Sequence, residues 1–204
     1  MTDSNVQRWL DAKTLDDIGE LTAQYIEGGL SFHPLHGNGI DEETIRIKDR
    51  LTFFNRNGFV TTQSQPAVPL SEDGHAQRAC VEGWASIELA KQLATLGLHT
   101  DLLVFVCPAF EDYGCRIPVT LEEFRPYTWF GFNNGAANLE EIEEKFSEGA
   151  KWMFCLTWVV TIIDLQWGRE YYLWDNVYEC LARPLDKPFS VVPWCEELGT
   201  DFVY

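Results

Sequence analysis

The spacing of apolar residues along the chain predicts a series of helices. Ile18, Leu21 and Tyr25 recur at helical intervals and would share one face. Thr14 is a typical N-cap for this helix, and Gly28 is a typical residue at which it would end. By the same criteria, further helices are expected over residues 6–12, 42–57, 86–96, 139–148 and 171–183.

Short runs of β-branched and apolar residues predict the strands. Phe59–Thr62 follows the Asn-Gly end of a helix, and 77–84 is ambiguous between strand and helix. Leu102–Cys107 is continuously apolar, which predicts a central strand covered on both faces. Further strands are expected over 116–120, 127–132 and 152–164, with Pro118 placing the first of these at a sheet edge.

The order of these elements favours an α+β or three-layer α/β fold. Neither strict alternation of strand and helix nor an all-β pattern is present, so we expect a single domain with a mixed central sheet flanked by helices. The length of 204 residues and a hydrophobic fraction of 46% suit one domain with one core. Within residues 1–204, we expect 1–40 to form a helical N-terminal appendage and 185–204 a packed C-terminal tail.

The formal net charge of −17 narrows the possible partners. Direct binding to nucleic acid is disfavoured, because phosphates are attracted by Lys and Arg and repelled by carboxylates. An anionic membrane surface is disfavoured for the same reason. A basic protein partner would be attracted, whereas the simpler alternative is that the acidity only keeps the protein dissolved.

Cysteine usage and the apolar runs indicate a cytoplasmic protein. The six cysteines include no C-x-x-C pair, and several lie in apolar surroundings, which is typical of buried free thiols in a reducing compartment. A disulfide between Cys107 and Cys115 is the alternative. The polar start has no signal-peptide pattern, and no apolar run reaches the roughly 18 residues of a membrane span.

Polar side chains cluster where the predicted strand at 59–62 ends. Small hydroxyls, amides and one arginine occur there, and such groups at a strand end are typical of a ligand-binding site. The candidate ligand-binding residues are Thr62, Ser64, Gln65, Gln77, Arg78 and Asp164. Arg78 could bind a carboxylate or phosphate, and Asp164 could form a polar centre with it if their strands are neighbours. The same residues are also compatible with strand, turn and capping roles.

Motifs for cofactors and known catalytic centres are missing from the sequence. No G-x-G-x-x-G, Walker or G-x-S-x-G spacing occurs, so no cofactor is predicted and no catalytic residue is identified. His33 and His36 lack further ligands nearby, and Pro34 disfavours a helix between them, so no metal site is predicted.

One predicted helix is strongly acidic. Its carboxylates could meet a basic partner, although the solvated face of an amphipathic helix explains them equally well. The candidate partner-binding residues are Glu140, Glu141, Glu143 and Glu144.

Two linked motifs resemble a known family. They read Asn55-Arg56-x-Gly58-Phe59-x-Thr61-x-x-Ser64-Gln65-Pro66 and Gln77-Arg78-Ala79-x-Val81-x-Gly83. The pattern is similar to that of uncharacterised actinomycete proteins, as are the later Ile163-Asp164 and Trp167-Gly168-Arg169. The resemblance implies a shared fold and a common polar centre, and it implies no particular reaction.

Three functional hypotheses follow from these observations. The first is a small acidic cytoplasmic protein that neutralises or inhibits a basic macromolecular partner. The alternative is an enzyme or small-molecule binder with a polar pocket at the end of strand 59–64. A third, weaker possibility is a scaffold protein in which the polar cluster is a structural hydrogen-bond network.

Overall fold

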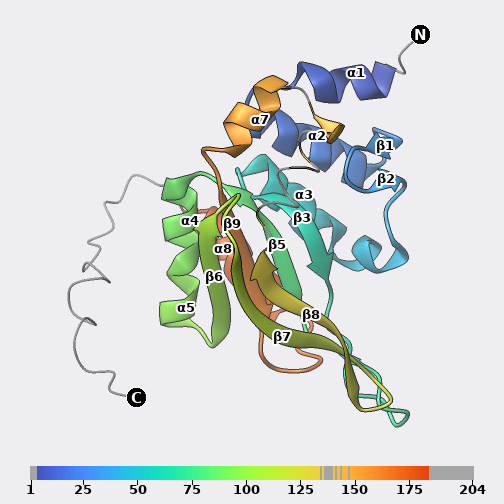
Figure 1. Ribbon diagram of the computed structural model, residues 1–204. Coiled ribbons are helices and arrows are strands. Elements are labelled where there is room, and N and C mark those ends of the chain that lie inside the picture. Colours follow the sequence, from blue (N-terminus) through green and yellow to red (C-terminus); the bar gives the residue numbers. More distant parts are fainter. Residues whose placement is uncertain are drawn as a thin grey trace, which may run out of the picture.

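A four-stranded antiparallel sheet forms the centre of the fold (Figure 1). The computed structural model describes residues 4–133, 135, 140, 142, 144–146 and 148–183. The strands lie in the order β3 (Val60–Gln65), β5 (Cys80–Ala85), β9 (Trp158–Asp164) and β6 (Leu102–Pro108). Helices and strands are interspersed along the chain, but the central strands pair in antiparallel fashion, which confirms the predicted α+β class.

β9, the last strand among the described residues, lies in the middle of this sheet. β5 and β6 are joined by α4 (Ile87–Ala94) and α5 (Leu96–His99), and both are antiparallel to β9, which separates them. The helical crossover therefore makes β5 and β6 parallel to each other, but β9 prevents them from pairing. For this reason the sheet is antiparallel throughout, where the sequence predicted a mixed one. The apolar strand β6 lies at an edge, so its predicted central position was wrong.

A second, three-stranded sheet covers one face of the first. Its strands lie in the order β4 (Ala76–Gln77), β7 (Tyr113–Glu122) and β8 (Arg125–Asn133). Val119 packs against Cys80 and Ile163 between the two sheets. β7 is the middle strand, although Pro118 predicted an edge. The short β4 pairs only with residues 120 and 121, so Pro118 lies beyond the paired part.

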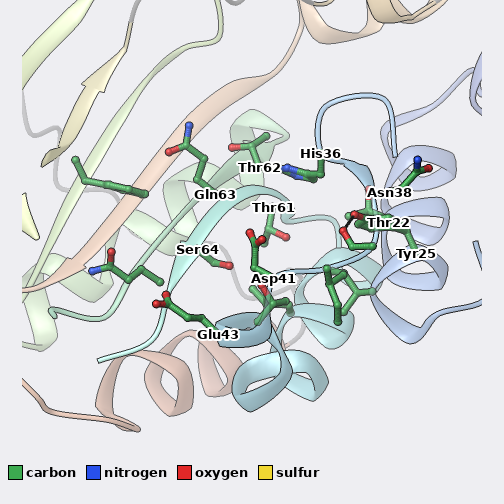
Figure 2. A pocket seen from close by; sticks show the side chains of 17 residues that line it. Thr22, Tyr25, His36, Asn38, Asp41, Glu43, Thr61, Thr62, Gln63 and Ser64 are labelled. Carbon is green, nitrogen blue, oxygen red and sulfur yellow. Dashed lines mark hydrogen bonds between the residues drawn. The ribbon is translucent and has the colours of Figure 1, made fainter. Parts of the chain in front are cut away.

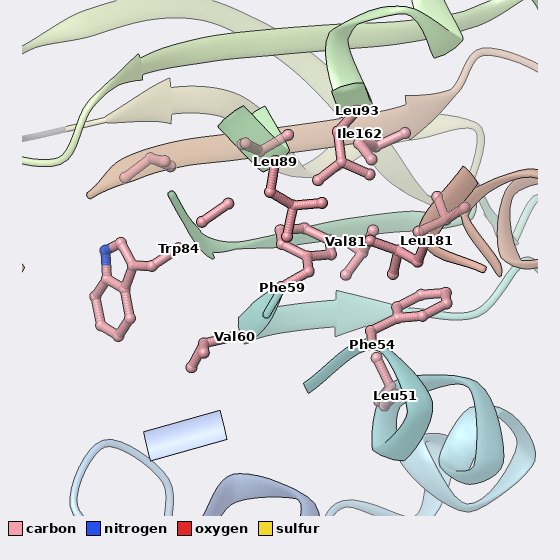
Figure 3. Close-up of a cluster of buried hydrophobic side chains, with 14 of the residues drawn as sticks. Leu51, Phe54, Phe59, Val60, Val81, Trp84, Leu89, Leu93, Ile162 and Leu181 are labelled. Carbon is pink, nitrogen blue, oxygen red and sulfur yellow. The ribbon is translucent and has the colours of Figure 1, made fainter. Parts of the chain in front are cut away.

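Helices cover the other face of the central sheet. Phe54, Leu93 and Leu181 come from α3 (Lys48–Arg56), α4 and α8 (Tyr172–Leu181), and each is buried in the main core. Figure 3 shows these side chains gathered around Val81 and Ile162 of the central strands. The alternation of side chains along each strand thus gives the sheet one helix-covered face and one sheet-covered face.

The N-terminal segment packs into this same core. It comprises α1 (Ser4–Asp11), α2 (Leu15–Glu27), β1 (Phe32–His33), β2 (Gly37–Asn38) and η1 (Glu42–Ile47). Thr14 forms the predicted cap of α2, as a capping box with Asp17, and Gly28 ends the helix with φ of 88°. Trp9 and Ile18 belong to the core that the central sheet forms. The expected C-terminal tail, 185–204, lies outside the described residues.

The predicted strand 152–164 is divided between a helix and a strand. α7 (Glu148–Phe154) precedes β9, so the prediction was wrong for the first residues. The Phe154 carbonyl accepts hydrogen bonds from the Thr157 N–H at 3.0 Å and the Thr157 hydroxyl at 2.8 Å. This turn separates two apolar segments that read as one continuous run in the sequence.

Two further predictions concern a possible disulfide and membrane-spanning segments. Cys107 and Cys115 form no disulfide with each other, so the alternative of a disulfide between them was wrong. Burial raises the pKa of the Cys80 thiol well above its usual value, which keeps it protonated and unreactive.

In the described part of the chain, no helix combines the length and apolarity of a membrane-spanning segment.

Asn55 connects the end of α3 to the start of β3. Its side-chain nitrogen donates to the Leu51 carbonyl and to the Thr61 hydroxyl, both at 2.8 Å. Its side-chain oxygen accepts from the Thr61 N–H at 3.0 Å. Asn55 is 1% exposed, so water cannot replace these bonds, and the asparagine sets where β3 begins.

We therefore expect Asn55→Ala to lower the free energy of unfolding by about 2–4 kcal/mol, because it leaves buried partners without hydrogen bonds. Asn57→Ala is the matched control, since Asn57 is exposed and its side chain donates to the Phe53 carbonyl. It should cost less than about 1 kcal/mol. Urea unfolding measures both, and equal losses would contradict the assigned role of Asn55.

Candidate functional site

A pocket of about 390 Å³ lies beside β3 (Figure 2). One wall is formed by residues 61–65 of β3, and another comes from Asp41 and from Glu43 in the first turn of η1. Thr22 and Tyr25 of α2 and His36 complete much of the lining. The volume falls within the range typical of small-molecule sites, about 300–1,000 Å³.

A β-bulge explains why so many consecutive residues of β3 reach this pocket. Thr61 pairs with Gly83 and Gln63 pairs with Glu82, which leaves Thr62 as an extra residue in the ladder. In a regular strand, side chains alternate between two faces, whereas the bulge re-aims them. β3 is also an edge strand, with β5 as its only partner in the described sheet. Its outer side is therefore available to the pocket.

The charged groups of the pocket are acidic. Asp41 and Glu43 line it, and its described lining includes no lysine or arginine. Burial raises the pKa of Tyr25, and the nearby Asp41 carboxylate raises it further, so the phenol stays neutral. The Tyr25 hydroxyl donates to the Gly39 carbonyl and so holds the loop against α2. The pocket therefore favours neutral or positively charged ligands over anions.

The structure brings half of the predicted ligand-binding residues to this pocket. Thr62, Ser64 and Gln65 line it. Gln77 lies next to it and donates from its amide to Glu43 at 3.2 Å. The amide nitrogen of Gln65 donates to the Arg78 and Val119 carbonyls, both at 3.0 Å. Gln65 thus also joins β3 to the second sheet.

Arg78 does not line the pocket. Its guanidinium donates to the Pro118 carbonyl at 2.7 Å and lies over the Trp167 ring, 4.1 Å from the centroid. The residue thus fastens the second sheet to the segment that follows β9. Its hydrogen bond and ring contact indicate a structural role, and no anion-binding role is needed to explain it.

Asp164 is also absent from the pocket lining. It is fully buried and accepts two hydrogen bonds from Arg169, at 2.6 and 2.7 Å. Arg169 also donates to Asp101, whose pKa these bonds lower to about 2. The polar centre that the sequence suggested for Asp164 and Arg78 is therefore built by Asp164, Arg169 and Asp101. It ties the ends of β9 and β6 to α8.

The acidic segment is only partly described. Glu140 and Glu144 are exposed, while Glu141 and Glu143 lie outside the described residues. Ile142 and Phe146 are buried in the main core. The segment thus has one apolar side against the body and at least two carboxylates facing solvent.

His33 lies close to the pocket and is 2% exposed. Its Nδ1 accepts a hydrogen bond from the Leu35 N–H at 3.1 Å, which assigns the ring proton to Nε2. The ring packs edge-on against Trp9 and stacks on His36, with centroids 4.5 Å apart in both pairs. Burial, the neighbouring His36 and the more distant Lys145 lower the pKa of His33 to about 2.

Glu82 is a candidate functional residue that the sequence analysis missed. It lies on β5 and accepts a hydrogen bond from the Thr161 hydroxyl at 2.5 Å. The Tyr113 hydroxyl lies 2.6 Å from the same Thr161 oxygen. Burial raises the pKa of the Glu82 carboxyl. The signal in the sequence was a single acid inside the otherwise uncharged run Cys80–Ala85.

These features define an α+β protein with a polar, acidic pocket beside an edge strand. Residues 4–184 match a family described as "Domain of unknown function (DUF6919)", and the chain belongs to this family.

A curated relative is methylenetetrahydrofolate reductase 1 of Schizosaccharomyces pombe (strain 972 / ATCC 24843). The two are 37% identical over 76 residues, which make up 37% of this chain and 12% of the reductase. The similarity therefore concerns a short part of a much longer protein.

The buried His33 should make the fold sensitive to acid. The unfolded chain can bind a proton at this histidine below its ordinary pKa near 6.5, and the folded chain excludes it down to about 2. Stability from this group is therefore present above about pH 6.5 and is lost as the pH falls, by up to about 1.4 kcal/mol per pH unit.

Denaturant unfolding between about pH 7.5 and 5.5 measures this loss. His33→Asn, which can still accept the Leu35 N–H, should flatten the profile by about 1.4 kcal/mol over this interval. His99→Asn, at an exposed histidine, should follow the unsubstituted protein. A profile that His33→Asn leaves unchanged would contradict this role.

Proposed function

We propose that the protein binds a small polar molecule, neutral or positively charged, in the pocket beside β3. The observation that carries this proposal is the composition of the pocket wall. Residues 61–65, which carry hydroxyl and amide groups, line one cavity together with Asp41 and Glu43. Hydroxyls and amides can orient a ligand, and the carboxylates select its charge.

The reductase activity of the S. pombe relative is not extended to this chain. The chain matches 12% of that protein. The acidic lining is also poorly suited to the carboxylates of a folate, because like charges repel at short distance. The family resemblance fits a binding role better, since Thr61, Ser64 and Gln65 of the shared pattern line the pocket. It stays a prediction that this sequence pattern is typical of actinomycete proteins.

A thermal-shift screen tests the proposal. Neutral and cationic polar metabolites should raise the melting temperature, and anionic ones should not. Calorimetry on each cationic ligand found should then show a loss of affinity of about tenfold in Glu43→Gln, because a carboxylate contact is removed. Ser64→Ala should weaken any ligand that bonds its hydroxyl.

The matched control is Glu88→Gln, which removes an exposed carboxylate on α4 outside the pocket. It should leave affinity unchanged. A screen in which only anions bind, or ligands that are indifferent to Glu43 and Ser64, would overturn the proposal.

We also propose, as a second function, that a basic protein docks on the acidic segment. The net charge is −17, and residues 140–156 combine exposed Glu140 and Glu144 with exposed Trp152 and Leu156. A segment that carries both exposed acids and exposed apolar side chains suits a partner that is both basic and partly apolar. Such a partner could be inhibited or neutralised by this contact.

This second proposal predicts a complex that salt disrupts. Raising the salt to about 0.5 M should reduce capture of the partner from native lysate strongly, because exposed charges are screened. The double variant Glu140→Lys with Glu144→Lys should act likewise, whereas Glu88→Lys should not. Capture that neither salt nor the double variant reduces would exclude an electrostatic contact here.

A further inference from the structure

A second cavity, of about 50 Å³, shares Thr62 and Gln63 with the pocket. Glu82 and Trp84 of β5 line it, together with the apolar side chains of Leu35, Ile142 and Val159. The bulge in β3 therefore stands between the two cavities. The space is large enough for a water molecule or a small chemical group, since one water needs roughly 10–15 Å³ on this measure.

The hydrogen bonds around Glu82 have a definite direction. The Thr161 hydroxyl has one proton and donates it to Oε2 of Glu82 at 2.5 Å. The Tyr113 hydroxyl must therefore donate to the Thr161 oxygen, 2.6 Å away. Burial raises the pKa of Tyr113 beyond its usual range, so this phenol keeps its proton. Both hydroxyls thus point their protons toward the carboxyl of Glu82.

This carboxyl has no positive partner among the described residues. Burial raises its pKa, and the bond from Thr161 is the opposing influence. Neither an ion pair to Glu82 nor a hydrogen bond to its Oε1 is formed in the described part of the chain. Buried carboxylates in proteins are normally paired, because an unpaired charge away from water is costly.

We propose that the small cavity is a subsite for a compact cationic group, such as an ammonium or methylammonium. Glu82 is the counter-ion, and the Trp84 ring with the apolar walls covers the group's methyl or methylene surface. Carboxylate and indole together are a typical setting for such cations. A purely apolar group would fit the walls, but it would leave the half-buried carboxyl with the Thr161 hydroxyl and no positive partner.

The ligand's other end would occupy the larger pocket, so this assignment rests on the proposed function. It names the class of ligand more narrowly: a polar molecule with a cationic end group. Thr62 and Gln63, which line both cavities, would contact the link between the two ends.

Methylammonium chloride is the probe that tests the subsite by itself. The readout is the Trp84 indole N–H signal in a ¹H–¹⁵N spectrum, one of eight tryptophans, assigned by its loss in Trp84→Phe. At about pH 8, where more of the Glu82 carboxyl is ionised, methylammonium should shift this signal saturably. Methanol, its neutral counterpart, and sodium chloride at equal ionic strength should not.

Glu82→Gln should weaken methylammonium binding by about tenfold or more, because the shape is kept and the charge is lost. Glu72→Gln, which removes an exposed carboxylate in a loop, should leave it unchanged. Thermal unfolding checks that both variants fold, and Glu82→Gln should be at least as stable as the unsubstituted protein at this pH. Absence of saturation, equal binding of methanol, or full affinity in Glu82→Gln would each overturn the subsite.

The variant Glu43→Gln separates this proposal from the broader one. It lies in the larger pocket and should leave methylammonium affinity unchanged. If methylammonium fails while screened ligands still depend on Glu43 and Ser64, the subsite is wrong and the pocket stands. If methylammonium binds and no screened ligand does, the subsite stands and the proposed function fails.

Discussion

The central sheet depends on β9, which lies between two strands that precede it by some fifty residues or more. Its residues from Val159 to Asp164 are all buried, with β5 pairing on one side and β6 on the other. Val160 and Ile162 enter the helix-covered face, whereas Ile163 enters the layer between the sheets. β5 and β6 each pair with β9 and not with each other, so without β9 nothing would join them into one sheet. These pairings close long loops, which costs chain entropy before the burial is gained.

The candidate site makes use of this long-range pairing. Glu82 and Thr161 are 79 positions apart in the chain and become neighbours only when β5 pairs with β9. The larger pocket instead lies at the open edge of β3, where the ladder is interrupted by a bulge and the start of the strand is fixed by Asn55. A rigid paired interior with an irregular edge suits ligand binding, since the interior sets positions and the edge leaves space.

Local features of the fold could be predicted from the sequence, because their cause is local. Thr14, Ser86 and Gly28 act at helix ends within three or four residues of the groups they cap. The apolar runs were less informative, since apolarity reports burial and does not distinguish an edge strand from a central one. Residues 152–157 were for this reason wrongly predicted as part of a strand, and β6 was correctly predicted as a strand but wrongly placed at the sheet centre. The sequence suggested that Arg78 and Asp164 form one polar centre. In the structure, Asp164 instead accepts hydrogen bonds from Arg169, five residues away, and Arg78 lies over the Trp167 ring. The choice among several possible charged partners is made by tertiary packing.

A small cationic ligand and a basic protein would both be attracted by the negative charge of this protein, but solvent ions would screen the two attractions to different degrees. A net charge of −17 raises the local concentration of any cation around the protein, whether a small ligand or a basic surface. At Glu140 and Glu144 the charges face solvent, so ions screen them and attraction is weak at high salt. At Glu82 the carboxyl is half-buried, and burial raises its pKa, so its attraction for a cation is stronger and less screened than at the exposed carboxylates. The cationic end group of a ligand would therefore be held mainly by the half-buried Glu82 carboxyl, whereas a basic protein would depend on several exposed carboxylates. Salt is for this reason the variable that tells the two uses of the same acidity apart.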